Sequence, residues 1–117
     1  GGCLLYTSSG AAYTGMDSQP VYGMMKSGIH ALSRHVASRW GKQGIRSNVI
    51  APGLIVHPAM EAMMGTQYAE QILDTLKVTR NGKPEDIAAM AALLLSEEGG
   101  FITGQVFSID GGATMRP

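Results

Sequence analysis

The chain has 117 residues, 44% of them hydrophobic, which suits one globular domain or part of a larger one. Nine Lys and Arg residues balance nine Asp and Glu residues, and the charges are scattered. This pattern argues against nucleic acid or an anionic membrane as a partner and favours a small, neutral molecule. The single cysteine excludes an internal disulfide, and no apolar run approaches the roughly 20 residues that span a bilayer, so we expect a cytoplasmic protein.

The first predicted element is a strand at Cys3–Thr7, a short apolar run typical of a strand buried on both faces. A helix is predicted over 21–40, because apolar residues recur there every three or four positions. The stripe expected to face the core consists of Met25, Ile29, Leu32, Val36 and Trp40. The opposite side carries Met24, Gly28, Ala31 and His35. Both sides could be covered, which suggests a subunit contact.

The rest of the chain continues the alternation of strands and helices. Residues 45–53 predict a second strand closed by Pro52 and Gly53, and residues 57–78 predict two short helices. Pro84 at the first turn and glycines at 99 and 100 delimit a further helix. Residues 104–112 predict a third strand ending at Gly111.

This order predicts an α/β fold, a three-layer parallel sheet joined by right-handed crossovers. Ligands of such sheets bind beyond the carboxyl ends of the strands. Ser9 follows the first strand, and Tyr22 and Lys26 lie one turn apart at the start of the next helix. A free phenol ionises near pH 10, and a nearby ammonium group favours the phenolate. A solvated surface pair remains the simple alternative for these two residues.

Five motifs in order carry more weight than the pair alone: "SSG" at 8–10, "YGMMK" at 22–26, "GIRSNVIAPG" at 44–53, "GKPEDIA" at 82–88 and "ITGQVFSIDGG" at 102–112. Together they resemble the short-chain dehydrogenase/reductase family. The resemblance runs from Gly2 to about Ala113 and matches only the C-terminal half of a typical member. It implies a partial Rossmann-like fold, in which residues 1–117 are the C-terminal part of one domain whose dinucleotide-binding half is absent.

The resemblance also implies an activity, the interconversion of a ketone and a secondary alcohol with NAD or NADP. Tyr22 would transfer the substrate proton, Ser9 would orient the substrate oxygen, and Lys26 would hold the nicotinamide ribose and assist the tyrosine. The family's enoyl reductases place more residues between tyrosine and lysine, so "YGMMK" favours carbonyl reduction. The full-length protein is expected to be a homodimer or homotetramer, and no metal site is implied.

Pro52, Gly53 and Ile55 would contact the nicotinamide, although they could also form only a strand-ending turn. His57 stands where the family usually has threonine, and we interpret it as a loop residue and not a catalytic one. Met60 and its neighbours Met63 and Met64 fall at the family's substrate lid, with core filling as an alternative. Asn48 is expected to serve local structure, and Asp110 with the two following glycines is expected to close the last strand.

No glycine-rich turn of the dinucleotide-binding type occurs in the chain. We therefore expect the chain alone to be inactive and its first strand to have an unpaired edge that favours aggregation. A second hypothesis is a non-catalytic interaction module of the same fold. A serine hydrolase is a distant third, because "TSSGA" around Ser9 is not a nucleophile elbow.

Overall fold

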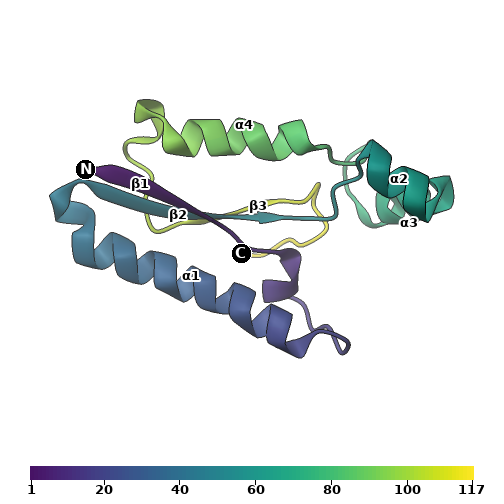
Figure 1. Ribbon diagram of the computed structural model, residues 1–117, viewed down its shortest axis with the longest axis horizontal. Helices are drawn as coiled ribbons and strands as arrows, with labels where there is room; N and C mark the ends of the chain where they lie inside the picture. The colour runs from purple at the N-terminus through teal and green to yellow at the C-terminus, as the bar shows by residue number, and fades with distance from the viewer.

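The computed structural model covers residues 1–117 and has helices on both sides of one sheet (Figure 1). Its strands and α-helices are β1 (Gly2–Thr7), α1 (Pro20–Trp40), β2 (Ile45–Pro52), α2 (Pro58–Met64), α3 (Thr66–Thr75), α4 (Pro84–Leu95) and β3 (Val106–Ile109). Each predicted element is present, and boundaries differ by only a few residues. None of the helices is long and apolar enough to cross a membrane.

The three strands form one parallel sheet in the order β1-β2-β3. Tyr6 pairs with Val49, and Val49 pairs in turn with Val106. The core is centred on the middle strand β2, where Val49 is fully buried and Ile50 is 2% exposed. The predicted parallel α/β fold is confirmed. β1 pairs with β2 along one edge only, and its Leu4 is 41% exposed.

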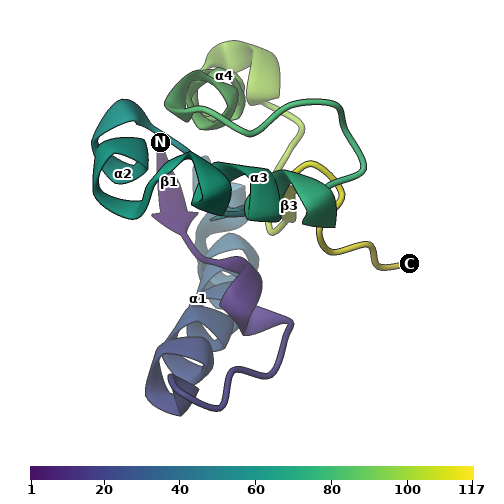
Figure 2. The ribbon, with the colours of Figure 1, turned by 90° about the vertical axis from the view of Figure 1, so that its right-hand side faces the viewer.

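The two connections between strands have opposite hands. β1 to β2 and β2 to β3 step across the sheet in the same direction, yet α1 and α4 cover opposite faces (Figures 1 and 2). The β1–α1–β2 unit is right-handed, and the prediction of a right-handed crossover is wrong for β2–α4–β3. The right-handed preference arises when a twisted strand leads into a helix that packs straight back onto the sheet. The connection over residues 53–105 contains two additional helices and can reach the other face.

The side of α1 that faces the sheet matches the predicted apolar stripe only in part: Val36 is buried as expected, and Ile29 and Trp40 are half-buried. The buried residues of this helix are His30, Ser33 and Val36, whereas Met25 is 62% exposed and Leu32 is 49% exposed. Polar groups are tolerated inside because they are paired: Ser33 Oγ lies 2.9 Å from Ser47 Oγ on β2. A hydropathy pattern assigns such a face to solvent, which explains the error.

Two polar residues of β2 hold the segment that returns from α4 to β3. Arg46 donates through its guanidinium to the carbonyl oxygens of Leu94, Ser96, Gly99 and Ile102, at 2.8 to 3.3 Å. Asn48, fully buried, donates to Ile102 O at 2.9 Å and accepts from Gln105 N–H at 3.1 Å. The structural role expected for Asn48 is confirmed, and the role of Arg46 was not predicted.

Candidate active site

The carboxyl ends of the three strands share one edge of the sheet with the loop after β1, the start of α1 and the α2–α3 pair (Figure 1). Ser9 follows β1 and is the N-cap of the short 3₁₀ turn Gly10–Ala12. Its Oγ accepts the N–H of Ala11 at 3.2 Å. Because the hydroxyl oxygen serves as acceptor, the hydroxyl proton of Ser9 remains available to another group.

Tyr22 and Lys26 occupy the first two turns of α1, which begins with Pro20 in its first turn. The Lys26 ammonium lies 5.6 Å from the centroid of the Tyr22 ring, so the two side chains stand on one side of the helix. Lys26 Nζ donates to the carbonyl oxygen of Thr7 at 2.9 Å, which ties it to the end of β1. Tyr22 is 44% exposed, and its ring is open to a molecule arriving at this edge.

The segment after β2 carries the residues expected to meet the nicotinamide. Gly53 N–H donates to Ile109 O at 3.0 Å, which continues the pairing with β3. Pro52 has no N–H group, and the N–H of Ile55 donates to no acceptor within the chain. A free backbone donor beside an exposed loop fits the carboxamide of a nicotinamide ring. The free N–H of Ile55 therefore suits the nicotinamide end of the cofactor.

His57 caps helix α2, its Nδ1 accepting the N–H of Met60 at 3.2 Å, in agreement with the loop role that we expected. Two of the three methionines of α2 face outward: Met63 is 81% exposed and Met64 is 49% exposed. Core filling is therefore wrong for these two residues. They form an apolar surface beyond the strand ends.

Asp110 closes β3, as expected. Its carboxylate accepts the N–H groups of Gly112 and Thr114 at 3.0 Å and the Thr114 hydroxyl at 2.6 Å. Gly111 and Gly112 both have positive φ angles, which glycine adopts without strain.

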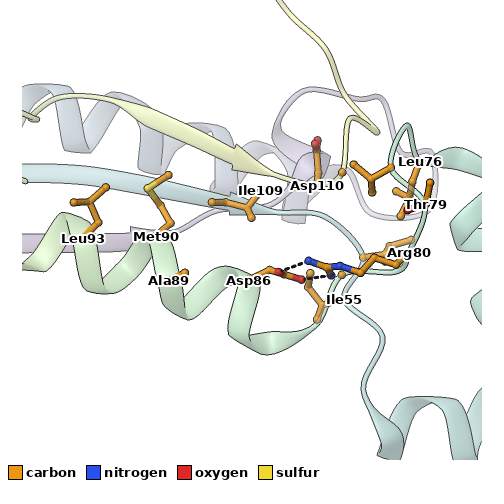
Figure 3. A pocket seen from close by; sticks show the side chains of 14 residues that line it. Ile55, Leu76, Thr79, Arg80, Asp86, Ala89, Met90, Leu93, Ile109 and Asp110 are labelled. Carbon is orange, nitrogen blue, oxygen red and sulfur yellow. Dashed lines mark hydrogen bonds and ion pairs between the residues drawn. The ribbon is translucent and has the colours of Figure 1, made fainter.

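A cavity of about 610 Å³ lies between α4 and the end of β3 (Figure 3). Ile55, Met90 and Ile109 line it, and at its rim Arg80 and Asp86 form a bidentate pair with both contacts at 2.7 Å. The Arg80 hydrogen bond, with the Lys83 N–H, holds the pKa of Asp86 well below its usual range. Ser9, Tyr22 and Lys26 do not line this cavity. Their grouping rests on the shared edge of the sheet.

One polar contact beside these residues was not predicted. Ser8 Oγ lies 2.6 Å from Nε2 of His30, and both residues are buried. Burial, followed by the charges of Arg34 and Arg116, lowers the pKa of His30. The only signal in the sequence was a histidine eight residues after Tyr22, one helical turn beyond Lys26.

The parallel sheet between helical layers, with polar side chains at its carboxyl edge, defines a Rossmann-like α/β protein. Residues 1–114 match the family model described as enoyl-(acyl carrier protein) reductase. The chain belongs to the short-chain dehydrogenase/reductase family, and its relatives are oxidoreductases.

Among curated proteins, the chain is 35% identical over 116 residues to 7alpha-hydroxysteroid dehydrogenase of Bacteroides fragilis, covering 99% of this chain and 45% of the relative. Among solved structures, 4-hydroxyisoleucine dehydrogenase complexed with NADH superposes with a TM-score of 0.87 at 29% identity, covering 98% of this chain and 48% of that one. A 7alpha-hydroxysteroid dehydrogenase complexed with NADH and 7-oxo glycochenodeoxycholic acid has a TM-score of 0.85 at 29% identity, with coverages of 97% and 45%. The chain spans less than half the length of these proteins.

Proposed function

We propose that this chain is the substrate-side part of an NAD(P)-dependent oxidoreductase that interconverts a ketone and a secondary alcohol. The observation that carries the proposal is the placement of Lys26 within 5.6 Å of the Tyr22 ring, at the edge where ligands of parallel sheets bind. Relatives that act on hydroxysteroids and 4-hydroxyisoleucine, by their names, support this chemistry. NAD(P) would supply or accept the hydride when bound.

In this proposal Tyr22 is the proton donor to the carbonyl oxygen during reduction, and Ser9 donates its free hydroxyl proton to the same oxygen. Lys26 has three N–H groups, and Thr7 O accepts only one of them. Two remain for the ribose hydroxyls of the nicotinamide. Pro52, Gly53 and Ile55 form the wall that would hold the ring, with the free N–H of Ile55 as its donor.

The outward-facing methionines of α2 suggest the class of ketone. Met63 and Met64 present unbranched thioethers beyond the strand ends, a surface that adapts to apolar shapes. We therefore propose an apolar ketone as substrate. The chain has no glycine-rich phosphate cradle, so residues 1–117 alone are not expected to bind NAD(H) or NADP(H) with useful affinity. Calorimetric titration that gave a micromolar dissociation constant would contradict this expectation.

A second candidate is the reduction of an enoyl thioester, which the description of the matching family model favours. The four-residue spacing of Tyr22 and Lys26 favours the ketone. A non-catalytic interaction module remains the alternative from another class, supported by the exposed apolar residues of α1.

The test is the substitution Tyr22→Phe in a longer chain that supplies the other half of the relatives' fold. Phenylalanine retains the ring and removes only the hydroxyl, so we expect carbonyl reduction to fall by about 10² to 10⁴-fold with cofactor binding almost unchanged. Steady-state kinetics with an apolar ketone and with an enoyl thioester separate the two reactions. Wild-type turnover of both substrates by the variant would reject Tyr22 as the proton donor, and an inactive parent chain would favour the module.

A further inference from the structure

Ser8 and His30 form a buried contact that the proposed chemistry does not use. Ser8 is 3% exposed at the end of β1, and His30 is 8% exposed on the sheet-facing side of α1. The distance of 2.6 Å from Ser8 Oγ to His30 Nε2 is that of a strong hydrogen bond. Twenty-two residues separate the two along the chain, so the bond connects β1 directly to α1.

The protons of this contact can be assigned from a second bond. Ser8 Oγ also lies 3.3 Å from the carbonyl oxygen of Lys26, and a hydroxyl has only one proton to donate. Both contacts are satisfied when His30 Nε2–H donates to Ser8 Oγ and the Ser8 hydroxyl donates to Lys26 O. A neutral imidazole with its proton on Nε2 provides this arrangement.

The contact lies between the residues to which the proposed function assigns roles. Ser8 stands between Thr7, whose carbonyl accepts from Lys26 Nζ, and Ser9. The N–H of Ser8 also donates to Ile50 O at 2.7 Å, which fixes the position of Ser8 along β2. His30 lies one helical turn after Lys26 on the same side of α1. The end of β1 is thus attached to α1 twice, through Lys26 Nζ and through Ser8.

The surroundings of His30 hold its ring in one orientation. The Tyr13 ring covers it at a centroid distance of 5.2 Å, and the Arg116 guanidinium lies 3.6 Å above the Tyr13 ring. Arg116 also donates to Ser108 Oγ at 2.7 Å, which brings the C-terminal tail over this layer. The charged groups that act on His30 are Arg34 on α1 and Arg116 on the tail, and both oppose a charged imidazole.

We propose that His30 is a positioning residue for the reaction: through Ser8 it sets the position of Ser9 relative to Lys26 and Tyr22. It contacts neither substrate nor cofactor in this proposal, which rests on the proposed function. Loss of the bond would leave the Ser8 side chain held to α1 only by its longer bond, 3.3 Å, to the carbonyl oxygen of Lys26. Small displacements of a group that orients substrate cost large factors in rate.

The test compares three substitutions in the longer, active chain. His30→Leu removes the bond at similar volume, and His30→Gln retains an N–H that can reach Ser8. Ser33→Ala is the matched control, because it removes the equally buried Ser33–Ser47 bond further along the same helix. We expect His30→Leu to lower kcat about 10-fold or more with a smaller change in KM, and His30→Gln to restore most of it. Ser33→Ala should retain kcat even if it lowers the urea midpoint as much as His30→Leu does.

A second measurement does not depend on activity. In NMR spectra of the same protein, the amide signals of Ser9 and Gly10 should shift in His30→Leu and stay near their wild-type positions in Ser33→Ala. Unchanged Ser9 and Gly10 signals, or a kcat loss no larger than that of Ser33→Ala, would overturn the proposal. If Tyr22→Phe remained fully active while these amides shifted, the proposed function would fail and the control of Ser9 by His30 would stand.

Discussion

Gly53 lies so close to Asp110 that a Cβ atom added at Gly53 would stand 2.7 Å from the Asp110 Cβ and 2.9 Å from its Cα. The φ angle of Gly53 is not in the left-handed region, so the turn itself does not require glycine. The requirement is the close approach of the segment after β2 to the end of β3. The same approach places the segment that we propose to hold the nicotinamide beside Asp110.

Gly53→Ala should therefore destabilise the protein by about 1 to 3 kcal/mol, since the inserted methyl group forces backbone and side chain apart. Urea unfolding measures the change. Gly28→Ala is the control, because a Cβ at this helical position meets nothing within 4 Å and should stabilise α1 by about 0.5 to 1 kcal/mol. Equal effects of the two substitutions would contradict the close approach as the cause.

Lys26 and Ser9 should have separable effects in the active chain. Lys26→Ala removes the ammonium expected to reach the ribose, so the cofactor dissociation constant should rise about 10-fold or more along with a loss of turnover. Ser9→Ala removes one donor to the substrate oxygen and should lower kcat about 10²-fold with little change in cofactor binding. Fluorescence titration with NADH or NADPH, combined with steady-state kinetics, distinguishes the two patterns. The same cofactor constant in both variants would reject the ribose contact.

The buried imidazole predicts a dependence of stability on pH. The pKa of His30 is lowered in the folded protein, chiefly by burial, whereas an unfolded histidine titrates near 6.5. The unfolded chain therefore binds more protons below that pH, and the stability present above about pH 6.5 is lost as the pH falls toward the folded value. The slope from one group is at most about 1.4 kcal/mol per pH unit.

Thermal unfolding between pH 5 and 8 tests this dependence, and His30→Leu should show a smaller decline on acidification than the wild-type chain. His35→Gln is the control, since His35 is an exposed histidine of the same helix. If His30→Leu and the wild-type chain declined in parallel, His30 would not be the group responsible.

The outer side of α1 predicts assembly of the complete protein. Val21, Met25 and Leu32 are 63%, 62% and 49% exposed and lie on one side of the helix. We expect a homodimer or homotetramer in which this row is covered, and Met25→Glu with Leu32→Glu should shift it toward monomer without unfolding it. Light scattering at micromolar concentration measures the mass, with the exposed Ser38→Glu as control. A monomeric parent protein would count against the prediction.

The order of the elements, and the residues that follow each strand, could be predicted from the sequence. An apolar run such as Cys3–Thr7 and a strand-ending residue such as Pro52 are signals contained in a few neighbouring residues. The inner side of α1 could not be predicted, since His30 and Ser33 are buried by virtue of partners on β1 and β2 that no local pattern reveals. The hand of the β2–α4–β3 connection depends on the path of a long segment. Arg46 was missed for a related reason: its four carbonyl partners lie about 50 residues away.

The free edge of β1 can pair with a further strand, and this pairing would determine where the loop after that strand lies. Gly2 to Thr7 already align in parallel with Ile45 to Ile50, with the carboxyl ends at one side. A strand added in parallel to the other edge would run about 4.8 Å from β1 and end beside Thr7. Its following residues would emerge next to Ser9 and the Lys26 ammonium. A segment that pairs with β1 would therefore place the residues that follow it beside the proposed reaction centre.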